Sequence, residues 1–236
     1  MSEFLYGGGI VLLYFVIAAS TAFLLRGFVK IPNEIFQKGL HFLLLFSYLP
    51  FAFAFETWWI SVLAAIVLGV LVYPALALAE RIPGFSAFTT ERKHGELKRS
   101  MVLAFGMLAF CNTVCWGLFG DKCMTLACMY AWGVGDAFAA LIGKKYGKHK
   151  IKWKFADGRK SVEGSCAMFV TSAIAVAVVL LAHNHLTVPA YIVIPLAGAG
   201  AATLVEMTVR DGNDTIYCPM AAMAVMLPLM ALFGGF

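Results

Sequence analysis

The chain has 236 residues, of which 61% are hydrophobic and 13% carry a charge, with a formal net charge of +5. A soluble domain is typically about 45–50% apolar and about 25% charged, so this composition excludes an ordinary soluble protein. The apolar runs are too long and too helix-prone for the alternating strands of an outer-membrane barrel. We therefore expect an all-α integral membrane protein in which residues 1–236 form a single polytopic domain.

Eight apolar runs have about the length that a membrane span requires. A transmembrane helix needs about 20 predominantly apolar residues. Pro219 and Pro228 interrupt the last run, so the sequence does not define where that helix begins and ends. Pro74, Pro189 and Pro195 are expected to kink or start their helices. In chain order, the predicted spans cover residues 8–25, 39–55, 58–79, 101–120, 123–143, 162–182, 187–205 and 215–236.

Basic residues occur in alternate loops between these runs. Of the 18 Lys and Arg residues, all except Lys122 follow the first, third, fifth or seventh span. The positive-inside rule then places the loops at about 80–100, 144–161 and 206–214 in the cytoplasm and both termini outside. Within the first of these loops, the charge alternation of residues 91–100 predicts an interfacial helix. We expect a multi-pass protein of a prokaryotic plasma membrane, with its active site facing the cytoplasm.

Four carboxylates lie at the cytoplasmic ends of predicted spans: Asp136, Glu163, Glu206 and Asp214. Asp136 precedes Lys144 by about two helical turns, roughly 12 Å. A charged residue inside a membrane span is costly, so each acid is a functional candidate. Structural alternatives exist: Asp136 as a salt-bridged acid, Glu163 as a favourable first-turn acid, and Glu206 and Asp214 as solvated residues beside a short loop.

The basic loop between the fifth and sixth spans has three interpretations. It sets topology, it binds anionic lipid headgroups, or it holds a phosphorylated ligand. We favour the last, because carboxylates on both sides of a basic loop suit a divalent cation that bridges carboxylate and phosphate. The segment from Lys160 to Ser165 adds a helix N-terminus, which binds anions readily. His41, three residues after Lys38, is either a contact to phosphate or substrate hydroxyl or a polar core residue.

Two segments resemble the signature of the CTP-dependent lipid kinases. The first is Gly135-Asp136, then Ala139, then Gly143-Lys144-Lys145-Tyr146-Gly147, and the second is Lys160-Ser161 followed by Gly164-Ser165. This family includes dolichol kinase, phytol and farnesol kinases and a yeast-type diacylglycerol kinase that uses CTP. The phosphatidate cytidylyltransferases share a more distant version of the same pattern.

Two flanking segments resemble the family more weakly. Lys38-Gly39-Leu40-His41 is similar to an early R-K-x-x-H motif, with Gln37 where Arg is usual. Glu206, Asp214 and Pro219 are similar to a late acidic motif, although Thr215 and Tyr217 replace its Asn and Thr, and Asp211 and Asn213 are neighbouring substitutes. The resemblance therefore covers about residues 37–220.

The resemblance implies a kinase that transfers the γ-phosphate of CTP to the hydroxyl of a membrane lipid alcohol. It implies Mg²⁺ held by Asp136 with Glu163 or Asp214, and a catalytic group of Asp136, Glu163, Glu206 and His41. The resemblance does not decide whether Asp136 or Glu206 is the general base. The residues implied in binding CTP are Gly135, Lys144, Lys145, Lys148, Lys160, Ser161, Gly164, Ser165 and Lys38.

The acceptor alcohol is the least determined part of this prediction. The compact chain resembles the smaller members of this family, and that resemblance implies an isoprenoid alcohol such as a polyprenol, dolichol, phytol, farnesol or geranylgeraniol. Diacylglycerol is the alternative acceptor. The alternative enzyme is a phosphatidate cytidylyltransferase that forms a CDP-lipid, and the alternative outside enzymes is a transporter. Against a transporter, the acids lie toward one membrane face and the chain shows no duplicated halves.

Overall fold

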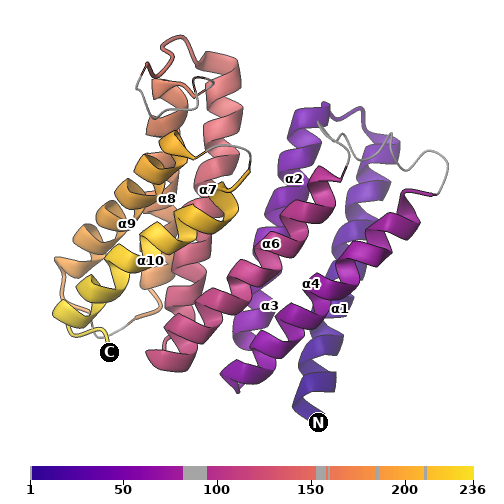
Figure 1. The fold of residues 1–236 in the computed structure, drawn as a ribbon, viewed down its shortest axis with the longest axis horizontal. Helices are drawn as coiled ribbons and strands as arrows, with labels where there is room; N and C mark the ends of the chain where they lie inside the picture. The colour runs from indigo at the N-terminus through magenta and orange to yellow at the C-terminus, as the bar shows by residue number, and fades with distance from the viewer. Residues whose placement is uncertain (1, 82–94, 153–157, 159, 184–185, 210–211) are drawn as a thin grey trace. The chain divides into compact units, whose positions relative to one another are not determined.

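The computed structural model describes residues 2–81, 95–152, 158, 160–183, 186–209 and 212–236 (Figure 1). This part of the chain is helical apart from its loops and one isolated β-bridge between Lys150 and Ser161. Its helices include eight that are long and apolar enough to cross a membrane. The predicted all-α, multi-pass membrane class and the predicted number of spans are confirmed. The chain divides into two compact units, Met1–Phe110 and Cys111–Phe236, which we describe separately.

The first unit contains the first three spans and most of the fourth helix. Its elements are α1 (Ser2–Phe28), α2 (Asn33–Phe46), α3 (Tyr48–Phe53), α4 (Trp58–Ala79) and α6 (Glu96–Cys111). The second span therefore begins earlier than predicted, at Asn33. The chain stays in the right-handed helical region at Ser47, between α2 and α3, so the two helices form one span.

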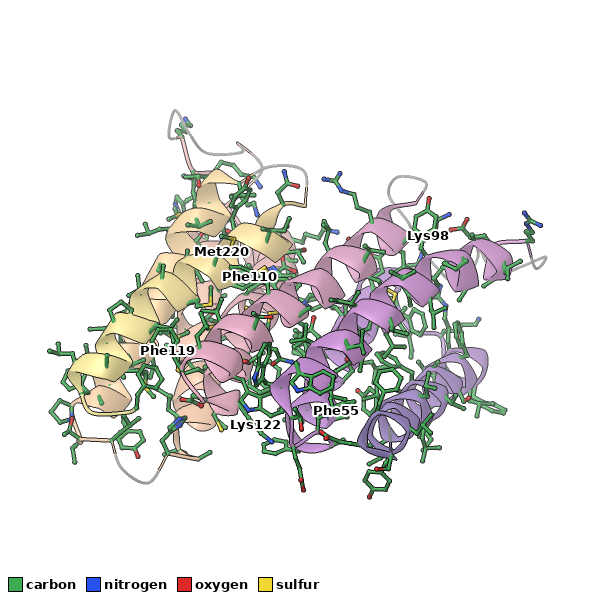
Figure 2. The ribbon with its side chains drawn as sticks, turned by 60° about the horizontal axis from the view of Figure 1, so that its bottom comes forward. Phe55, Lys98, Phe110, Phe119, Lys122 and Met220 are labelled. Carbon is green, nitrogen blue, oxygen red and sulfur yellow. The ribbon has the colours of Figure 1, made fainter. Side chains whose placement is uncertain are left out.

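Aromatic rings form the centre of this first unit. Phe51 stacks on Phe55 with 6.2 Å between ring centroids, and Phe105 packs edge-on against Phe51 at 6.1 Å. Phe55, labelled in Figure 2, lies so close to Gly7 that a Cβ at that position would approach its ring to 2.5 Å. Glu3 accepts hydrogen bonds from the backbone N–H groups of Glu56 and Thr57, and so caps the beginning of α4.

The start of α6 differs from the sequence-based expectation. Residues 96–100 form the first turns of this transmembrane helix rather than a separate interfacial helix, and residues 91–94 lie outside the described part of the chain. Lys98, also labelled in Figure 2, makes a 2.7 Å ion pair with Glu80 at the end of α4. This pair compensates the charge of a lysine that is 8% exposed, so Lys98 is more than a topology signal.

The second unit is a bundle of four long helices preceded by a π-helical segment. The segment is η1 (Asn112–Leu118), and the helices are α7 (Lys122–Tyr146), α8 (Val162–Leu180), α9 (Ala190–Thr208) and α10 (Asp214–Leu232). Helix α7 packs against α8, α9 and α10, while α8 packs on α9 and α9 on α10 (Figure 1). Pro195, Pro219 and Pro228 lie inside continuous helices, so α10 is not broken at its prolines.

Successive helices in this bundle run in opposite directions. The C-terminal ends of α7 and α9 therefore lie at the same end as the N-terminal ends of α8 and α10 (Figure 1). Large apolar side chains such as Val170, Ile174 and Val178 remain exposed along α8. Exposed apolar residues at this density are suited to contact with lipid. The same surface in water would promote aggregation.

Candidate functional site

Three of the four predicted carboxylates act electrostatically on one lysine at the shared end of the second unit. The Lys160 ammonium forms an ion pair with Oε1 of Glu206, a residue that is only 2% exposed. The charges of Asp136 and Asp214 act on the same lysine and on Glu206. Burial alone would lower the pKa of Lys160, but Glu206, Asp136 and Asp214 outweigh it, so the pKa is raised above its usual value. We call Lys160, Asp136, Glu206 and Asp214 the acid–lysine cluster.

The bundle brings the acid–lysine cluster together from distant parts of the sequence. Asp136 lies on α7, Glu206 in the last turn of α9, and Asp214 is the first residue of α10. Lys160 precedes α8, whose N-cap is Ser161. Because helices that alternate in direction bring opposite termini to one end, four short segments meet there. The sequence predicted each residue as a candidate, and the tertiary structure brings them together.

A short backbone pairing fixes the position of Lys160. The N–H of Ile151 donates to the carbonyl of Lys160 at 3.1 Å, and the N–H of Val162 donates to the carbonyl of His149 at 2.9 Å. Ser161 then caps α8, because its hydroxyl oxygen accepts a hydrogen bond from the N–H of Gly164 at 3.2 Å. A Ser N-cap is typically worth about 1 kcal/mol to a helix. Buried Ser161 therefore has a structural role beside the predicted contact to phosphate.

The glycines of the predicted motif allow α7 and α8 to approach closely. A Cβ at Gly164 would lie 2.9 Å from the carbonyl oxygen of Ala139 and 3.2 Å from Cα of Gly143. A Cβ at Gly135 would collide with Ser172 and lie 2.7 Å from Cγ of Met168. Gly135 and Gly164, predicted as nucleotide-binding residues, are thus buried at a helix–helix contact. Their small size holds Asp136 and the start of α8 at the same end.

Glu163 has partners outside the acid–lysine cluster. Its carboxylate is 2.7 Å from Nδ1 of His149 and also accepts from the His149 backbone N–H at 3.2 Å. The His149 side chain is 78% exposed, so this contact lies at the rim of the unit. Glu163 thereby joins the start of α8 to the turn after α7. Its predicted roles in catalysis and metal binding stay predictions.

The remaining predicted phosphate-binding residues lie near the same end. Lys144, Lys145 and Lys148 are placed around the end of α7, the first two in its last turn and the third just beyond it. Ser165, in the first turns of α8, is 8% exposed. The three lysines provide positive charge near the partly buried acid–lysine cluster, and such an arrangement attracts anions.

Two groups of predicted residues are not placed in this site. Lys38 and His41 lie on α2 in the first unit, so their contact with substrate stays a prediction. Asp211 lies outside the described residues, whereas Asn213 is the N-cap residue of α10.

Two residues at the site, Trp132 and Cys218, were not found by the sequence analysis. Nε1 of Trp132 donates to Oδ2 of Asp214 at 3.4 Å, and Trp132 precedes Asp136 by one helical turn on α7. Cys218, one turn after Asp214, is buried within the electrostatic reach of the whole acid–lysine cluster. The spacing of four residues from a predicted acid is a signal that could have identified both, because such residues share a helix face.

The acid–lysine cluster contains three carboxylates, the ligand type that hard divalent cations prefer. Asp136, Glu206 and Asp214 provide carboxylate oxygens, and the buried Oε2 of Glu206 has no hydrogen-bond partner within the described residues. No group of three or more His, Cys, Asp or Glu side chains in that part of the chain is placed to hold a metal ion. Mg²⁺ is commonly held by one or two carboxylates together with substrate phosphates and water, so a complete protein cage is not required.

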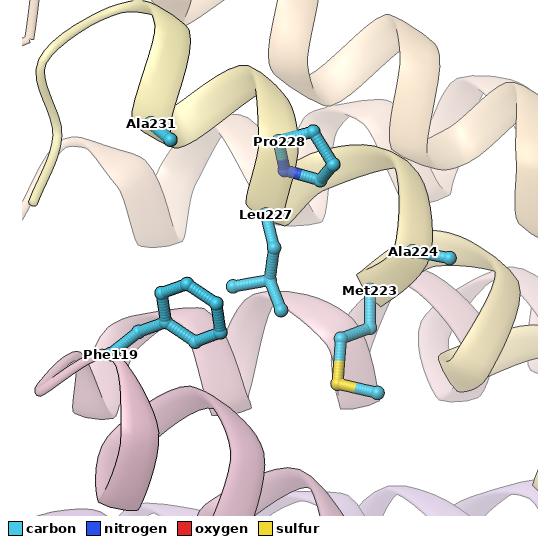
Figure 3. A pocket seen from close by; sticks show the side chains of 6 residues that line it. All are labelled: Phe119, Met223, Ala224, Leu227, Pro228 and Ala231. Carbon is cyan, nitrogen blue, oxygen red and sulfur yellow. The ribbon is translucent and has the colours of Figure 1, made fainter.

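An apolar pocket lies farther along α10, away from the acid–lysine cluster. It has a volume of about 320 Å³ and is lined by Phe119 and five residues of α10 (Figure 3). Met223, the first of these, follows Asp214 by nine residues, roughly 14 Å along the helix. Its apolar lining suits hydrocarbon rather than a nucleotide. The other lining residues are Ala224, Leu227, Pro228 and Ala231.

Comparisons with known proteins return no matching family model, no matching curated sequence and no matching solved structure.

Proposed function

We propose that this chain is a CTP-dependent kinase that phosphorylates the hydroxyl of a membrane lipid alcohol at the cytoplasmic face. The observation that carries the proposal is the acid–lysine cluster at the end of the second unit, beside the lysines at the end of α7. The sequence resemblance to CTP-dependent lipid kinases supports CTP as donor. The apolar helices around the cluster support a substrate that arrives from the bilayer.

The charge pattern suits phosphoryl transfer. This reaction requires positioning and neutralisation of phosphate charge more than covalent chemistry by the protein. Lys144, Lys145 and Lys148 would bind the triphosphate from the aqueous side. Lys160, held by Glu206 at the start of α8, would contact the phosphate nearest the acceptor. Mg²⁺ held by Asp136 and Asp214 would add charge neutralisation on the β- and γ-phosphates.

The chemical step is an in-line displacement at the γ-phosphorus. The lipid hydroxyl oxygen forms the new bond to phosphorus, and the bond from phosphorus to the β–γ bridging oxygen breaks. CDP leaves with the electron pair of that bond. The hydroxyl proton passes to a carboxylate, and Oε2 of Glu206 is a buried acceptor oxygen without a hydrogen-bond partner in the described part of the chain. Glu206 is thus the base that we favour over Asp136.

An isoprenoid alcohol is the acceptor that we favour, and diacylglycerol is the alternative. The direct experiment incubates the purified protein with Mg²⁺, γ-labelled CTP and a panel of farnesol, geranylgeraniol, phytol, a polyprenol and diacylglycerol. Labelled lipid phosphate together with CDP supports the kinase. Pyrophosphate and a CDP-lipid, formed when phosphatidate replaces the alcohols, would instead identify a cytidylyltransferase. No turnover and no retention of CTP would contradict both enzymes and favour a transporter.

Asp136→Asn tests the carboxylate requirement at nearly constant shape. We expect it to lower turnover by at least about a hundredfold, because removal of a single electrostatic group at a transition state typically costs that much. The control is Asp121→Asn at the other end of α7, where Asn keeps the ability to cap the helix. Phosphorylation of the best alcohol of the panel is measured for both variants. Near-normal turnover of a folded Asp136→Asn protein would contradict the proposal.

A further inference from the structure

Thr203 on α9 carries a buried hydroxyl that has no role in the phosphoryl-transfer step proposed above. The residue is 7% exposed, and its Oγ1 has no hydrogen-bond partner within the described residues. A buried polar group without a partner costs about 1–3 kcal/mol, so such groups are uncommon in folded proteins. The hydroxyl is therefore suited to a ligand that reaches this depth.

Two other threonines in the same bundle behave differently. Thr171 on α8 donates to the carbonyl of Ala167 at 2.8 Å, and Thr208 on α9 donates to the carbonyl of Val205 at 2.9 Å. Donation to a carbonyl of the preceding turn is the usual solution for a threonine inside a helix. Thr203 does not make this bond, so its hydroxyl keeps both its donor and its acceptor capacity.

Thr203 lies next to the base that we favour. It precedes Glu206 by three residues on α9, and residues at this spacing share a helix face with about 5–6 Å between their Cβ atoms. Oε2 of Glu206 is likewise buried and without a partner in this part of the chain, while Oε1 binds Lys160. Along the helix axis, Thr203 lies about 4.5 Å farther than Glu206 from the C-terminal end of α9. The two atoms therefore provide one donor and one acceptor at the membrane side of the acid–lysine cluster.

We propose that Thr203 Oγ1 and Glu206 Oε2 together bind the hydroxyl of the acceptor lipid. The threonine O–H donates to the lipid hydroxyl oxygen, and the lipid O–H donates to Glu206. This arrangement leaves one lone pair of the oxygen directed toward the γ-phosphate and specifies an alcohol instead of an ether or ester oxygen. The inference rests on the proposed kinase function and adds to it the residue that selects and orients the acceptor.

The test compares Thr203→Val, which keeps the shape and removes the hydroxyl, with Thr203→Ser, which keeps the hydroxyl. Thr171→Val is the matched control, because it removes a threonine hydroxyl that is bonded to its own helix. We expect Thr203→Val to raise KM for the best alcohol of the panel about tenfold, the loss expected for one hydrogen bond. KM for CTP should stay unchanged, and Thr203→Ser and Thr171→Val should stay within about twofold of the wild type.

A second measurement detects alcohol binding without turnover. In the absence of CTP and Mg²⁺, farnesol should raise the unfolding temperature of the wild-type protein more than farnesyl methyl ether does, and Thr203→Val should abolish this difference. A wild-type protein that phosphorylates alcohols, with Thr203→Val unchanged in both measurements, would overturn the inference alone. A wild-type protein that phosphorylates no alcohol and does not distinguish farnesol from its ether would overturn the proposed function and the inference together.

Discussion

At the scale of single residues, the site depends on an ion pair in which Glu206 is buried and Lys160 is partly exposed. The Glu206 side chain is 3% exposed and the Lys160 side chain 25% exposed. Desolvation of two charges largely offsets their attraction, whereas removal of one partner leaves the other uncompensated. Because the pKa of Lys160 is raised, the contribution of the lysine charge to stability is fully present below the usual lysine pKa. It is lost as the pH rises through the higher folded-state value.

This asymmetry predicts the outcome of a double-mutant cycle. We expect Lys160→Met to lower the free energy of unfolding by about 2 kcal/mol, less than the roughly 3–5 kcal/mol of a fully buried pair because water reaches the lysine. The double variant Lys160→Met/Glu206→Gln should regain most of this loss. Thermal unfolding in detergent measures both. Lys148→Met, beyond the end of α7, is the control and should change stability by less than about 0.5 kcal/mol. A double variant no more stable than Lys160→Met would show that the pair is not the cause.

At the scale of elements, the contact between α7 and α8 determines the geometry of the site. Gly143 and Gly164 face each other, and Ser172 on α8 donates to the carbonyl of Ala131 on α7 at 2.5 Å. Small residues let helix backbones approach closely in a membrane, where packing rather than the hydrophobic effect drives association. The glycines of the motif thus act through helix packing, and the residues of α7 reach those of α8 as a consequence.

Gly164→Ala is the sharpest test of this contact. The new methyl group would meet backbone atoms of Ala139 and Gly143, which cannot move independently of α7. We expect a loss of about 1–3 kcal/mol in the free energy of unfolding. The matched control is Gly106→Ala on α6, an exposed helical glycine where a Cβ would have no atom within 4 Å, so Ala should be neutral or stabilising by up to about 1 kcal/mol. Equal stability of the two variants would contradict a close contact at Gly164.

At the scale of the whole molecule, the distribution of charge predicts how the chain is oriented in the membrane. Among the described residues, eight helices are suited to cross a membrane, and an even number of crossings predicts both termini on the same side. The basic residues at the ends of α7 and α8 predict that the acid–lysine cluster faces the cytoplasm. At the other end of α7, Lys122 lies over the ring of Trp116 at 4.2 Å, and Asp121 is 2.7 Å from Nε2 of His183.

Reporter fusions test this orientation. In a bacterial expression host, a fluorescent protein that matures only in the cytoplasm should stay dark when fused to the C-terminus of the full chain. It should become fluorescent when fused after residue 152, because the loop between α7 and α8 is expected in the cytoplasm. An alkaline phosphatase that is active only outside should give the reverse result. A fluorescent C-terminal fusion of a full-length, inserted chain would contradict the orientation.

The sequence by itself determined the membrane class, the number of spans and the candidate acids. Apolar runs of about 20 residues must be helical in a bilayer, because every backbone polar group needs a partner within its own segment. Local patterns could not reveal which side chains share a site. The structure places the Glu163 carboxylate against His149, and a shared role of Glu163 with Asp136 stays a prediction. The tertiary structure decided that Lys160, Asp136, Glu206 and Asp214 form one cluster, because helix packing brings together residues that are far apart in the chain. It also revealed the buried hydroxyl of Thr203, since the absence of a hydrogen-bond partner among described residues is a property of packing and not of sequence.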